Sequence, residues 1–413
     1  TGEIKNENLL QRRILGLTSY FRSAQEELMP RFNIEEDFRV VDIPMSDYQF
    51  GLYKEARENE RVLETRNAKK RRMAQNGGVY ADTVSTYRIF SRAFCNFVFP
   101  RDIIRPMKQE GQGLQDAILD PGLDEDDMDA VSIQEKIANV DGRFEADDES
   151  ALESVSNQAV ETSYGARIKQ ALVDLEARSG EFLTPKKLEI YSPKFLEVLK
   201  NITSNERKLH LVYSQFRTLE GIGIFSIVLE ANGYTNFKLK KVAGIWKLDI
   251  PEEKLDLPKY ALFTGTESVE EKEILRNIYN GMWDKIPGGI RDYLLTKSPN
   301  NNHGEIISVF MITSSGAEGI TLKNTRMVHI MEPYWHPVRV EQVIGRARRI
   351  CSHNKLEEDE RDVKVFMYLM KFTEEQLVPE SAGGMAPKEL LEKDVSKINS
   401  QIPLTSDQHL YEV

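Results

Sequence analysis

The chain has 413 residues, of which 40% are hydrophobic and 29% are charged. This composition supplies enough apolar side chains for a core, so it excludes wholesale disorder. The chain contains two cysteines, which excludes a disulfide-rich scaffold and a zinc site built from four cysteines. No apolar run approaches the roughly 18–20 residues that cross a bilayer, and the first residues lack the pattern of a signal peptide.

The net charge of −11 comes from one part of the chain. Residues 110–153 hold fifteen acidic and two basic side chains, so the remainder is close to neutral. The acidic balance therefore does not argue against nucleic-acid binding by the rest of the chain. Because this stretch has few large apolar residues, we expect 106–158 to be an acidic linker or insertion that is largely flexible.

Residues 1–105 are predicted to form a mainly helical region. The apolar spacing over 8–17, after the candidate cap Asn8, indicates a first helix. A short apolar alternation over 39–43 is compatible with a strand.

The second helix of this region is predicted over 48–72 and ends in a basic cluster, Arg66 with Lys69, Lys70, Arg71 and Arg72. The cluster is either a solvated helix end, where cations are favoured, or a patch that contacts phosphate. Further along, aromatic residues recur at helical spacing at positions 87, 90, 94 and 97. This spacing favours a core-facing stripe over a base-stacking platform.

From about residue 160 the pattern changes to short apolar strands that alternate with helices. A helix is predicted over 160–178, and Ser192 followed by Pro193 predicts the start of another. Strand candidates follow at 208–214, 260–263, 306–312, 327–331 and 363–368, and helix candidates at 219–232, 269–279 and 338–349. This alternation is typical of an α/β fold with a parallel sheet covered by helices. We expect 159–375 to form this lobe and 376–413 to be a C-terminal tail.

The segment 342–349 carries the most informative chemistry. If it is helical, Gln342, Arg346 and Arg349 share one face. Two guanidinium groups on one face suit contact with phosphate oxygens, and Gly345 would allow another surface to approach closely. An ordinary arginine-rich surface helix is the alternative.

Two loops upstream favour the phosphate interpretation. The first follows a strand that ends at Thr313 and contains hydroxyl groups and glycines over 314–320. In open α/β sheets ligands bind beyond the carboxyl ends of the strands, where such a loop exposes backbone N–H groups. The second, at 332–337, is rich in proline and aromatic residues and leads into the arginine segment.

In chain order, four segments resemble motifs of the second RecA-like lobe of superfamily 2 helicases and translocases. Residues 211–216 resemble motif IV, 263–266 the short strand and turn after it, 313–320 motif V, and 342–349 motif VI (Gln-x-x-Gly-Arg-x-x-Arg). The stretches 13–20 and 328–335 are similar to helicase-like NTPases of nucleocytoplasmic large DNA viruses. These include the poxvirus nucleoside triphosphatase I and early transcription factor group. The resemblance covers roughly 1–60 and 190–375.

The resemblance implies roles for particular residues. Arg346 and Arg349 would reach the γ-phosphate of ATP bound by the first lobe and stabilise charge during phosphoryl transfer, while Gln342 would help to order that cleft. The implied nucleotide-binding set is Gly316, Glu318, Gly319 and Gly345. The implied nucleic-acid-binding set is Tyr213, Ser214, Gln215, Thr264, Gly265 and Ser315. ATP and Mg²⁺ would be held mainly by the first lobe.

The chain departs from the family because it contains no Gly-x-x-x-x-Gly-Lys-Ser/Thr phosphate loop. Residues 124–127 superficially resemble the Mg²⁺-binding acidic motif, but they follow Pro121-Gly122 rather than an apolar strand, so that role is rejected. We therefore expect the first lobe to be absent from this chain, the region 1–105 to attach to it, and the chain alone to be inactive. Cys351 and His353 lack two further local ligands, so a zinc site is also rejected.

The expected protein is thus the C-terminal part of an ATP-dependent, transcription-related viral helicase or translocase. Its expected partners are the first lobe, DNA or RNA and, as a further candidate, a viral RNA polymerase; no membrane is expected. A viral origin would place it in the virion or the host cytoplasm. Two alternatives remain. One is a non-catalytic helicase-like scaffold that docks on a viral polymerase or virion component, and the other is a nucleic-acid-binding module that acts through the basic cluster.

Overall fold

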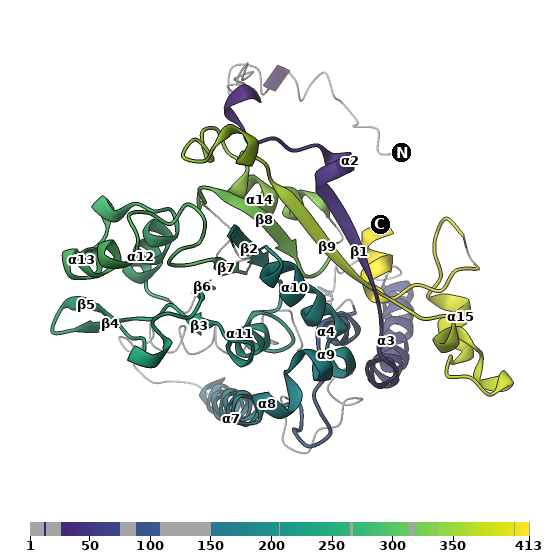
Figure 1. The fold of residues 1–413 in the computed structure, drawn as a ribbon. Coiled ribbons are helices and arrows are strands. Elements are labelled where there is room, and N and C mark those ends of the chain that lie inside the picture. Colours follow the sequence, from purple (N-terminus) through teal and green to yellow (C-terminus); the bar gives the residue numbers. More distant parts are fainter. Residues whose placement is uncertain are drawn as a thin grey trace.

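The computed structural model describes residues 12–13, 26–74, 88–107, 150–205, 207–264, 267–313, 319–334, 336–399 and 401–412. Its centre is a seven-stranded sheet with the order β1-β9-β8-β2-β7-β6-β3 (Figure 1). Every pair of neighbours in this sheet is parallel, which confirms the predicted α/β fold with a parallel sheet. The strands are β1 (Phe38–Pro44), β2 (Leu209–Tyr213), β3 (Thr235–Asn236), β6 (Lys259–Phe263), β7 (Val309–Ile312), β8 (Thr325–Ile330) and β9 (Lys364–Lys371). A separate antiparallel hairpin joins β4 (Leu239–Val242) to β5 (Ile245–Leu248).

The helices connect and cover these strands. They are α2 (Ile34–Asp37), α3 (Asp47–Ala74), α4 (Ile89–Asn96), α7 (Ser150–Ala177), α8 (Ser179–Phe182), α9 (Pro185–Tyr191), α10 (Pro193–Thr203), α11 (Ile222–Ala231), α12 (Val269–Tyr279), α13 (Gly288–Lys297), α14 (Pro337–Ala347), α15 (Lys388–Lys393) and α16 (Ser406–Glu412). Single 3-10 turns lie at η1 (Glu26–Leu28), η2 (Glu252–Lys254), η3 (Trp283–Lys285), η4 (Glu358–Glu360), η5 (Glu375–Leu377) and η6 (Glu380–Ala382). The start predicted at Ser192 is confirmed, because its side chain accepts a hydrogen bond from Phe195 N and Pro193 occupies the first turn. None of the helices in the described part of the chain is long and apolar enough to span a bilayer.

The sheet is buried on both faces because its strands alternate between two cores. Leu211 of β2 belongs to one core and the next residue, Val212, to the other. Helices α10 and α11 supply apolar residues to the core that contains Val212. Helices α12, α13 and α14 supply those of the opposite core. The result is the three-layered arrangement that a parallel sheet requires.

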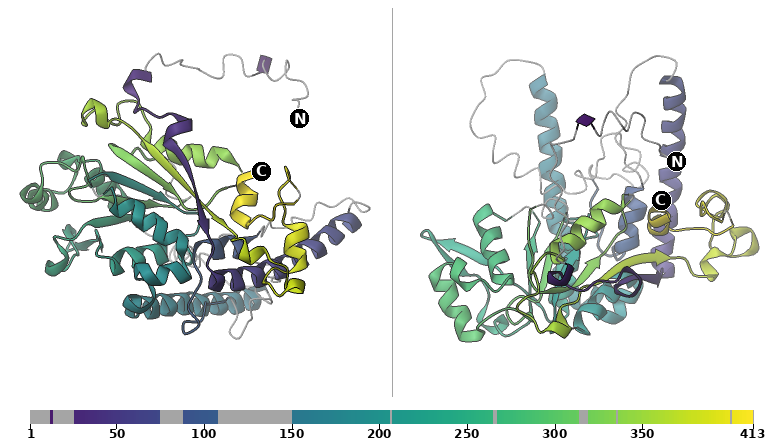
Figure 2. Two further views of the ribbon diagram at one scale, coloured as in Figure 1. Left: turned by 45° about the vertical axis from the view of Figure 1, so that its right-hand side comes forward. Right: turned by 90° about the horizontal axis from the view of Figure 1, so that it is seen from above.

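The described residues of the region 1–105 pack into the same body as the sheet. The strand predicted at 39–43 is confirmed as β1, which pairs in parallel with β9 at the edge of the sheet. The helix predicted over 48–72 is α3, whose Phe50 and Tyr53 are fully buried in the core beside α10. The aromatic stripe is confirmed as core, since Phe94 and Phe97 are buried. Figure 2 shows α3 and α7 extending beyond the sheet in the same direction.

Several predicted segments lie outside the described residues. These are most of 106–158, most of the helix predicted over 8–17, and position 87 of the aromatic stripe. The helix predicted to begin at residue 160 begins earlier, at Ser150, as α7. The basic cluster lies at the end of α3, and a role for it in phosphate binding stays a prediction.

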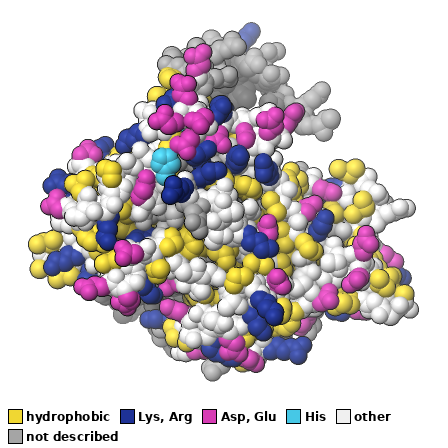
Figure 3. All heavy atoms as spheres, in the orientation of Figure 1, with side chains coloured by type: hydrophobic (Ala, Val, Ile, Leu, Met, Phe, Trp, Pro, Cys, Tyr) yellow, Lys and Arg dark blue, Asp and Glu magenta, His cyan; other side chains and the backbone are white. Residues whose placement is uncertain are grey.

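The tail after residue 376 is tied to the N-terminal helices by buried charge. The Asp394 carboxylate accepts hydrogen bonds from Arg57 Nε at 2.9 Å and Arg88 Nη2 at 3.1 Å, and it also pairs with Arg61. Burial raises the pKa of Asp394, but Arg57, Arg88 and Arg61 together hold it below its usual value. Unlike this buried cluster, the acidic and basic side chains on the face shown in Figure 3 lie at the surface and are intermingled.

Candidate functional site

The order of the strands brings the predicted loops to one edge of the sheet. The strands β8, β2, β7 and β6 are consecutive neighbours and all parallel, so the loops that follow them leave from the same edge. Chain connections run outward in opposite directions from β2 and β8, which makes their carboxyl ends the type of switch point where ligands bind in such sheets. Four predicted residues of these loops, Gly265, Ser315, Gly316 and Glu318, lie outside the described residues.

The residues at the end of β2 do not all face outward. Tyr213 is 1% exposed and Ser214 is 0% exposed, so both side chains are enclosed by the protein. The Thr264 side chain, after β6, is 4% exposed, and its Oγ1 donates to the Glu267 carboxylate at 3.2 Å. The sequence predicted that Tyr213 and Ser214 lie near a nucleic-acid backbone. Their enclosed side chains cannot make that contact in this structure. Successive residues of a strand point to opposite faces of the sheet, and both faces of β2 are covered, so both side chains are enclosed.

Glu332, two residues after the end of β8, organises this switch point. Its buried carboxylate accepts hydrogen bonds from Ser214 Oγ at 2.6 Å, from Gln215 N at 2.9 Å and from Asn96 Nδ2. Burial raises the pKa of Glu332, while nearby Lys194 and these hydrogen bonds oppose the rise. Glu332 thus joins the loop after β2 to the loop that leads into α14.

Gln215 makes a second connection between the same loops. Its Nε2 donates to Pro333 O at 3.2 Å, and its Oε1 accepts from the Arg92 guanidinium of α4. Sequence reasoning missed Glu332, Arg92 and Asn96 because no pattern links segments so distant in the chain. The one available signal was the acidic residue that directly follows the strand predicted over 327–331.

The arginine segment forms α14, which begins with His336 as its cap and Pro337 in the first turn. Gln342 is exposed and Arg346 is half-buried, one turn apart. The helix ends at Ala347, however, and Arg348 adopts φ −94°, ψ 85°. The prediction that Arg349 continues the helical face is therefore wrong. The last carbonyls of α14 are taken by other groups, among them Leu322 N, which donates to Arg346 O at 3.1 Å.

Arg349 instead folds back over the end of its own helix. Its Nε donates to Gly345 O at 3.3 Å, and its Nη1 donates to Thr321 Oγ1 at 2.9 Å. A guanidinium carries five N–H donors, and these contacts use two of them. Nη2 has no hydrogen-bond partner among the described residues, so this end of the fork remains available to an anion. Gly319, one of the predicted nucleotide-binding residues, lies in the same connection between β7 and β8, with φ 73°.

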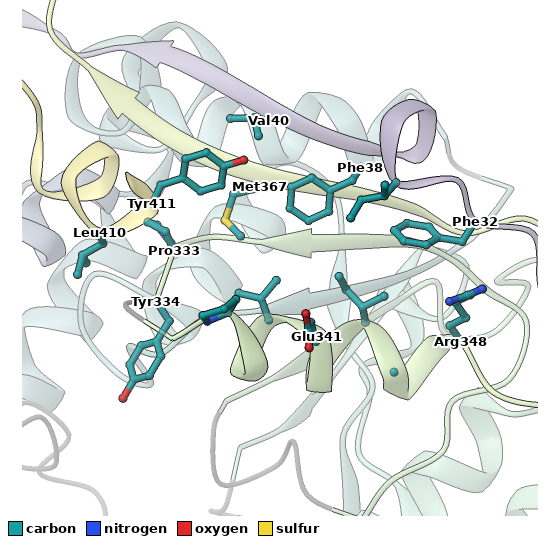
Figure 4. A pocket seen from close by; sticks show the side chains of 15 residues that line it. Phe32, Phe38, Val40, Pro333, Tyr334, Glu341, Arg348, Met367, Leu410 and Tyr411 are labelled. Atoms are coloured by element: carbon teal, nitrogen blue, oxygen red, sulfur yellow. The ribbon is translucent and has the colours of Figure 1, made fainter. Parts of the chain in front are cut away.

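The other side of α14 borders an apolar groove of about 770 Å³ (Figure 4). Its walls come from α14, from β1 and β9 and from α16, including Phe38, Met367 and Tyr411. A Cβ atom at Gly345 would meet nothing within 4 Å, so the helix surface is open there. The groove lining is mostly apolar, with Glu341 and Arg348 as its charged members, and it does not include Arg346 or Arg349. It therefore does not suit a triphosphate.

The rejected zinc interpretation finds no support in the geometry. Both ring nitrogens of His353 are engaged, Nδ1 with Ser352 Oγ at 2.8 Å and Nε2 with Thr325 O at 2.9 Å. Cys351 is exposed. The acidic run 124–127 lies outside the described residues.

Residues 265–351 match the family described as "Helicase conserved C-terminal domain". This span contains the connection from β7 to β8, the loop after β8 and α14. It therefore includes Arg346, Arg349 and Thr321, and it ends just beyond the turn at which Arg349 is held.

Similar proteins occur in large DNA viruses. A putative ATP-dependent RNA helicase of Acanthamoeba polyphaga mimivirus is 24% identical over 417 residues, which is 95% of this chain and 45% of the relative. A second helicase of that name from the same virus is 31% identical over 201 residues, 49% of this chain and 30% of the relative. The "Termination factor NPH-I homolog" of African swine fever virus is 32% identical over 203 residues, 44% of this chain and 26% of the relative. The chain spans less than half the length of each of these relatives. It contains a superfamily 2 helicase C-terminal lobe of the type found in nucleocytoplasmic large DNA viruses.

Proposed function

We propose that this chain supplies the second lobe of an ATP-dependent nucleic-acid helicase or translocase that acts in viral transcription. A first lobe, in the same or a separate chain, would bind ATP and Mg²⁺. The second lobe would contribute arginine side chains to the nucleotide and part of the surface for nucleic acid. The names of the viral relatives support the activity, and the name of the African swine fever virus relative supports the link with transcription termination.

One observation carries the nucleotide part of the proposal. The Arg349 guanidinium is held at two nitrogens by Gly345 and Thr321, and its Nη2 end is left for an anion. Arg346 is half-buried and lies one residue before the end of α14, three residues before Arg349. Two guanidinium groups on one flank of the lobe can stabilise the negative charge of a phosphoryl group held by a facing domain.

The chemistry of Arg346 and Arg349 suits a phosphate ligand better than a metal ion. Guanidinium groups are donors and suit phosphate oxygens, whereas Mg²⁺ requires oxygen ligands. The described residues contain no group of three or more His, Cys, Asp or Glu side chains arranged to hold a metal. In this proposal Mg²⁺ and the phosphate loop belong to the first lobe. Arg346 and Arg349 only position and neutralise charge, and the exposed Gln342 faces the first lobe.

The nucleic-acid part rests on the loops at the carboxyl edge of the sheet. We retain Gln215, Gly265 and Ser315 as candidates. Backbone groups of the loops after β2 and β6 replace the enclosed side chains of Tyr213, Ser214 and Thr264. Gln215 is half-buried. The remaining nucleotide candidates are Gly316, Glu318, Gly319 and Gly345.

ATPase kinetics of the protein that joins this lobe to its first lobe test the proposal. Arg346→Ala and Arg349→Ala should each lower kcat by roughly a thousandfold and change ATP binding far less. Arg291→Ala, which removes an exposed arginine paired with Asp292, serves as the matched control and should leave kcat unchanged. Unchanged turnover in both site variants would overturn the proposal. A joined protein that binds its partners but has no ATPase would instead support the scaffold alternative.

A further inference from the structure

The Arg349 side chain is held by a short chain of contacts that begins on another helix. We infer that Thr321 is a positioning residue for Arg349, and that Asn280 in turn fixes Thr321. This inference rests on the proposed function, since it assumes that Arg349 meets a nucleotide. It assigns a role to two residues that the motif pattern does not single out.

Thr321 lies in the connection between β7 and β8. Its Oγ1 accepts the hydrogen bond from Arg349 Nη1 at 2.9 Å. The next residue, Leu322, is fully buried and donates its N–H to Arg346 O at 3.1 Å. The connection is thus joined to the end of α14 at two adjacent residues, one through its backbone and one through its side chain.

Asn280 holds this connection from the opposite side. It follows α12 directly and is 4% exposed. Its Nδ2 donates to Thr321 O at 2.9 Å, and its Oδ1 accepts from Lys323 N at 2.7 Å. Because one amide group satisfies both the carbonyl of residue 321 and the N–H of residue 323, the turn between them has little freedom. The Thr321 hydroxyl is therefore presented at a fixed place.

The two anchors of Arg349 define the plane of its guanidinium group. The contact from Nε to Gly345 O is long, at 3.3 Å, and by itself leaves the group free to turn. The 2.9 Å contact to Thr321 removes that freedom. Catalysis by a positioned charge depends on such orientation before the reaction, because reorientation during the reaction is costly.

The same contact also suits a different role, in which Thr321 holds Arg349 away from the nucleotide. The number of N–H donors on the Arg349 guanidinium favours the positioning role. The contacts to Thr321 and Gly345 occupy two of five N–H groups, so neither contact must break for the terminal nitrogens to reach a phosphate. The two roles predict opposite effects on turnover, so the direction of the change decides between them.

The test uses ATPase kinetics of the protein that joins this lobe to its first lobe. Thr321→Val, which keeps the shape and removes the hydroxyl, should lower kcat by roughly 10- to 100-fold with little change in KM for ATP. Thr321→Ser, which keeps a hydroxyl, should restore most of the turnover. The matched control is Thr296→Val, which removes an exposed hydroxyl bonded only to Tyr293 O.

A double-variant cycle separates positioning from a general structural effect. In the Arg349→Ala background, Thr321→Val should cause no further loss, because the group that it positions is gone. A further loss of similar size in that background would overturn the inference, and so would an unchanged or increased kcat for Thr321→Val alone. If Arg349→Ala itself leaves kcat unchanged, the proposed function fails. If only Thr321→Val does so, the inference fails and the proposed function stands.

Discussion

Lys194 and Asp407 form an ion pair of 2.6 Å between Nζ and Oδ2, and both side chains are completely buried. Lys194, on α10, also donates to Asn96 Oδ1 and to Met331 O, next to Glu332. Asp407, on α16, also accepts from Met370 N of β9. The pair therefore fastens the C-terminal helix to the part of the sheet from which α14 departs.

Asp407→Asn should lower the free energy of unfolding by about 3–5 kcal/mol, because it removes the carboxylate that pairs directly with the buried Lys194 ammonium. Urea unfolding measures this change. Glu389→Gln is the control, since it breaks an exposed pair with Lys393 and should cost less than about 1 kcal/mol. Equal stability of Asp407→Asn and the unsubstituted chain would show that the buried pair does not hold the fold.

Two buried histidines should make the lobe sensitive to acid. His210 of β2 and His329 of β8 contact each other, with 3.0 Å between Nδ1 and Nε2, and His329 Nδ1 also contacts Tyr368 OH at 2.8 Å. Burial lowers the pKa of His210 from 6.5 to about 4, and burial followed by the neighbouring His210 also lowers the pKa of His329.

Because the folded state disfavours their protonation, these rings add stability above pH 6.5 that is lost as the pH falls from 6.5 towards 4. His210 alone should account for roughly 3 kcal/mol over this window. Urea unfolding at several pH values measures the slope. His329→Phe should make this slope smaller without abolishing it, because burial also lowers the pKa of His353 and of His409. A slope that His329→Phe leaves unchanged would assign the acid sensitivity to other groups.

The sequence predicted the local elements well and the long-range contacts poorly, for a physical reason. Strand alternation at 39–43 is a local pattern and predicted β1, but its pairing with β9 joins segments more than 300 residues apart. The periodic pattern in α14 continues to Arg349, yet contacts from Leu322 and Ser352 take the last carbonyls and end the helix at Ala347. The donor from Leu322 lies in another connection of the chain, and no sequence pattern links it to the end of this helix. The positions of the two arginines were therefore predictable, but the support of Arg349 by Thr321 was not.

Gly221 lies in a tight turn that leads into α11. A Cβ atom there would lie 1.9 Å from the backbone oxygen of Phe216, and that oxygen already accepts a hydrogen bond from Ile222 N. Gly221→Ala should therefore destabilise the chain by about 1–3 kcal/mol, because the backbone of the turn must shift. Gly289→Ala, at a site with nothing within 4 Å, is the control and should cause no loss in thermal unfolding. If Gly221→Ala unfolds at the same temperature as this control, the close approach is not a real constraint.

A substitution at Gly345 in α14 should affect stability and activity in opposite directions. It lies inside the helix, and a Cβ atom there would meet nothing within 4 Å. Gly345→Ala should therefore stabilise the isolated lobe by roughly 0.5–1 kcal/mol, since alanine favours the helix more than glycine does. If a first lobe approaches the helix closely at this point, the added methyl group should nevertheless lower the ATPase of the joined protein. Thermal unfolding of the lobe and turnover of the joined protein measure the two effects separately. Full ATPase in a more stable Gly345→Ala protein would show that no partner surface contacts the helix there.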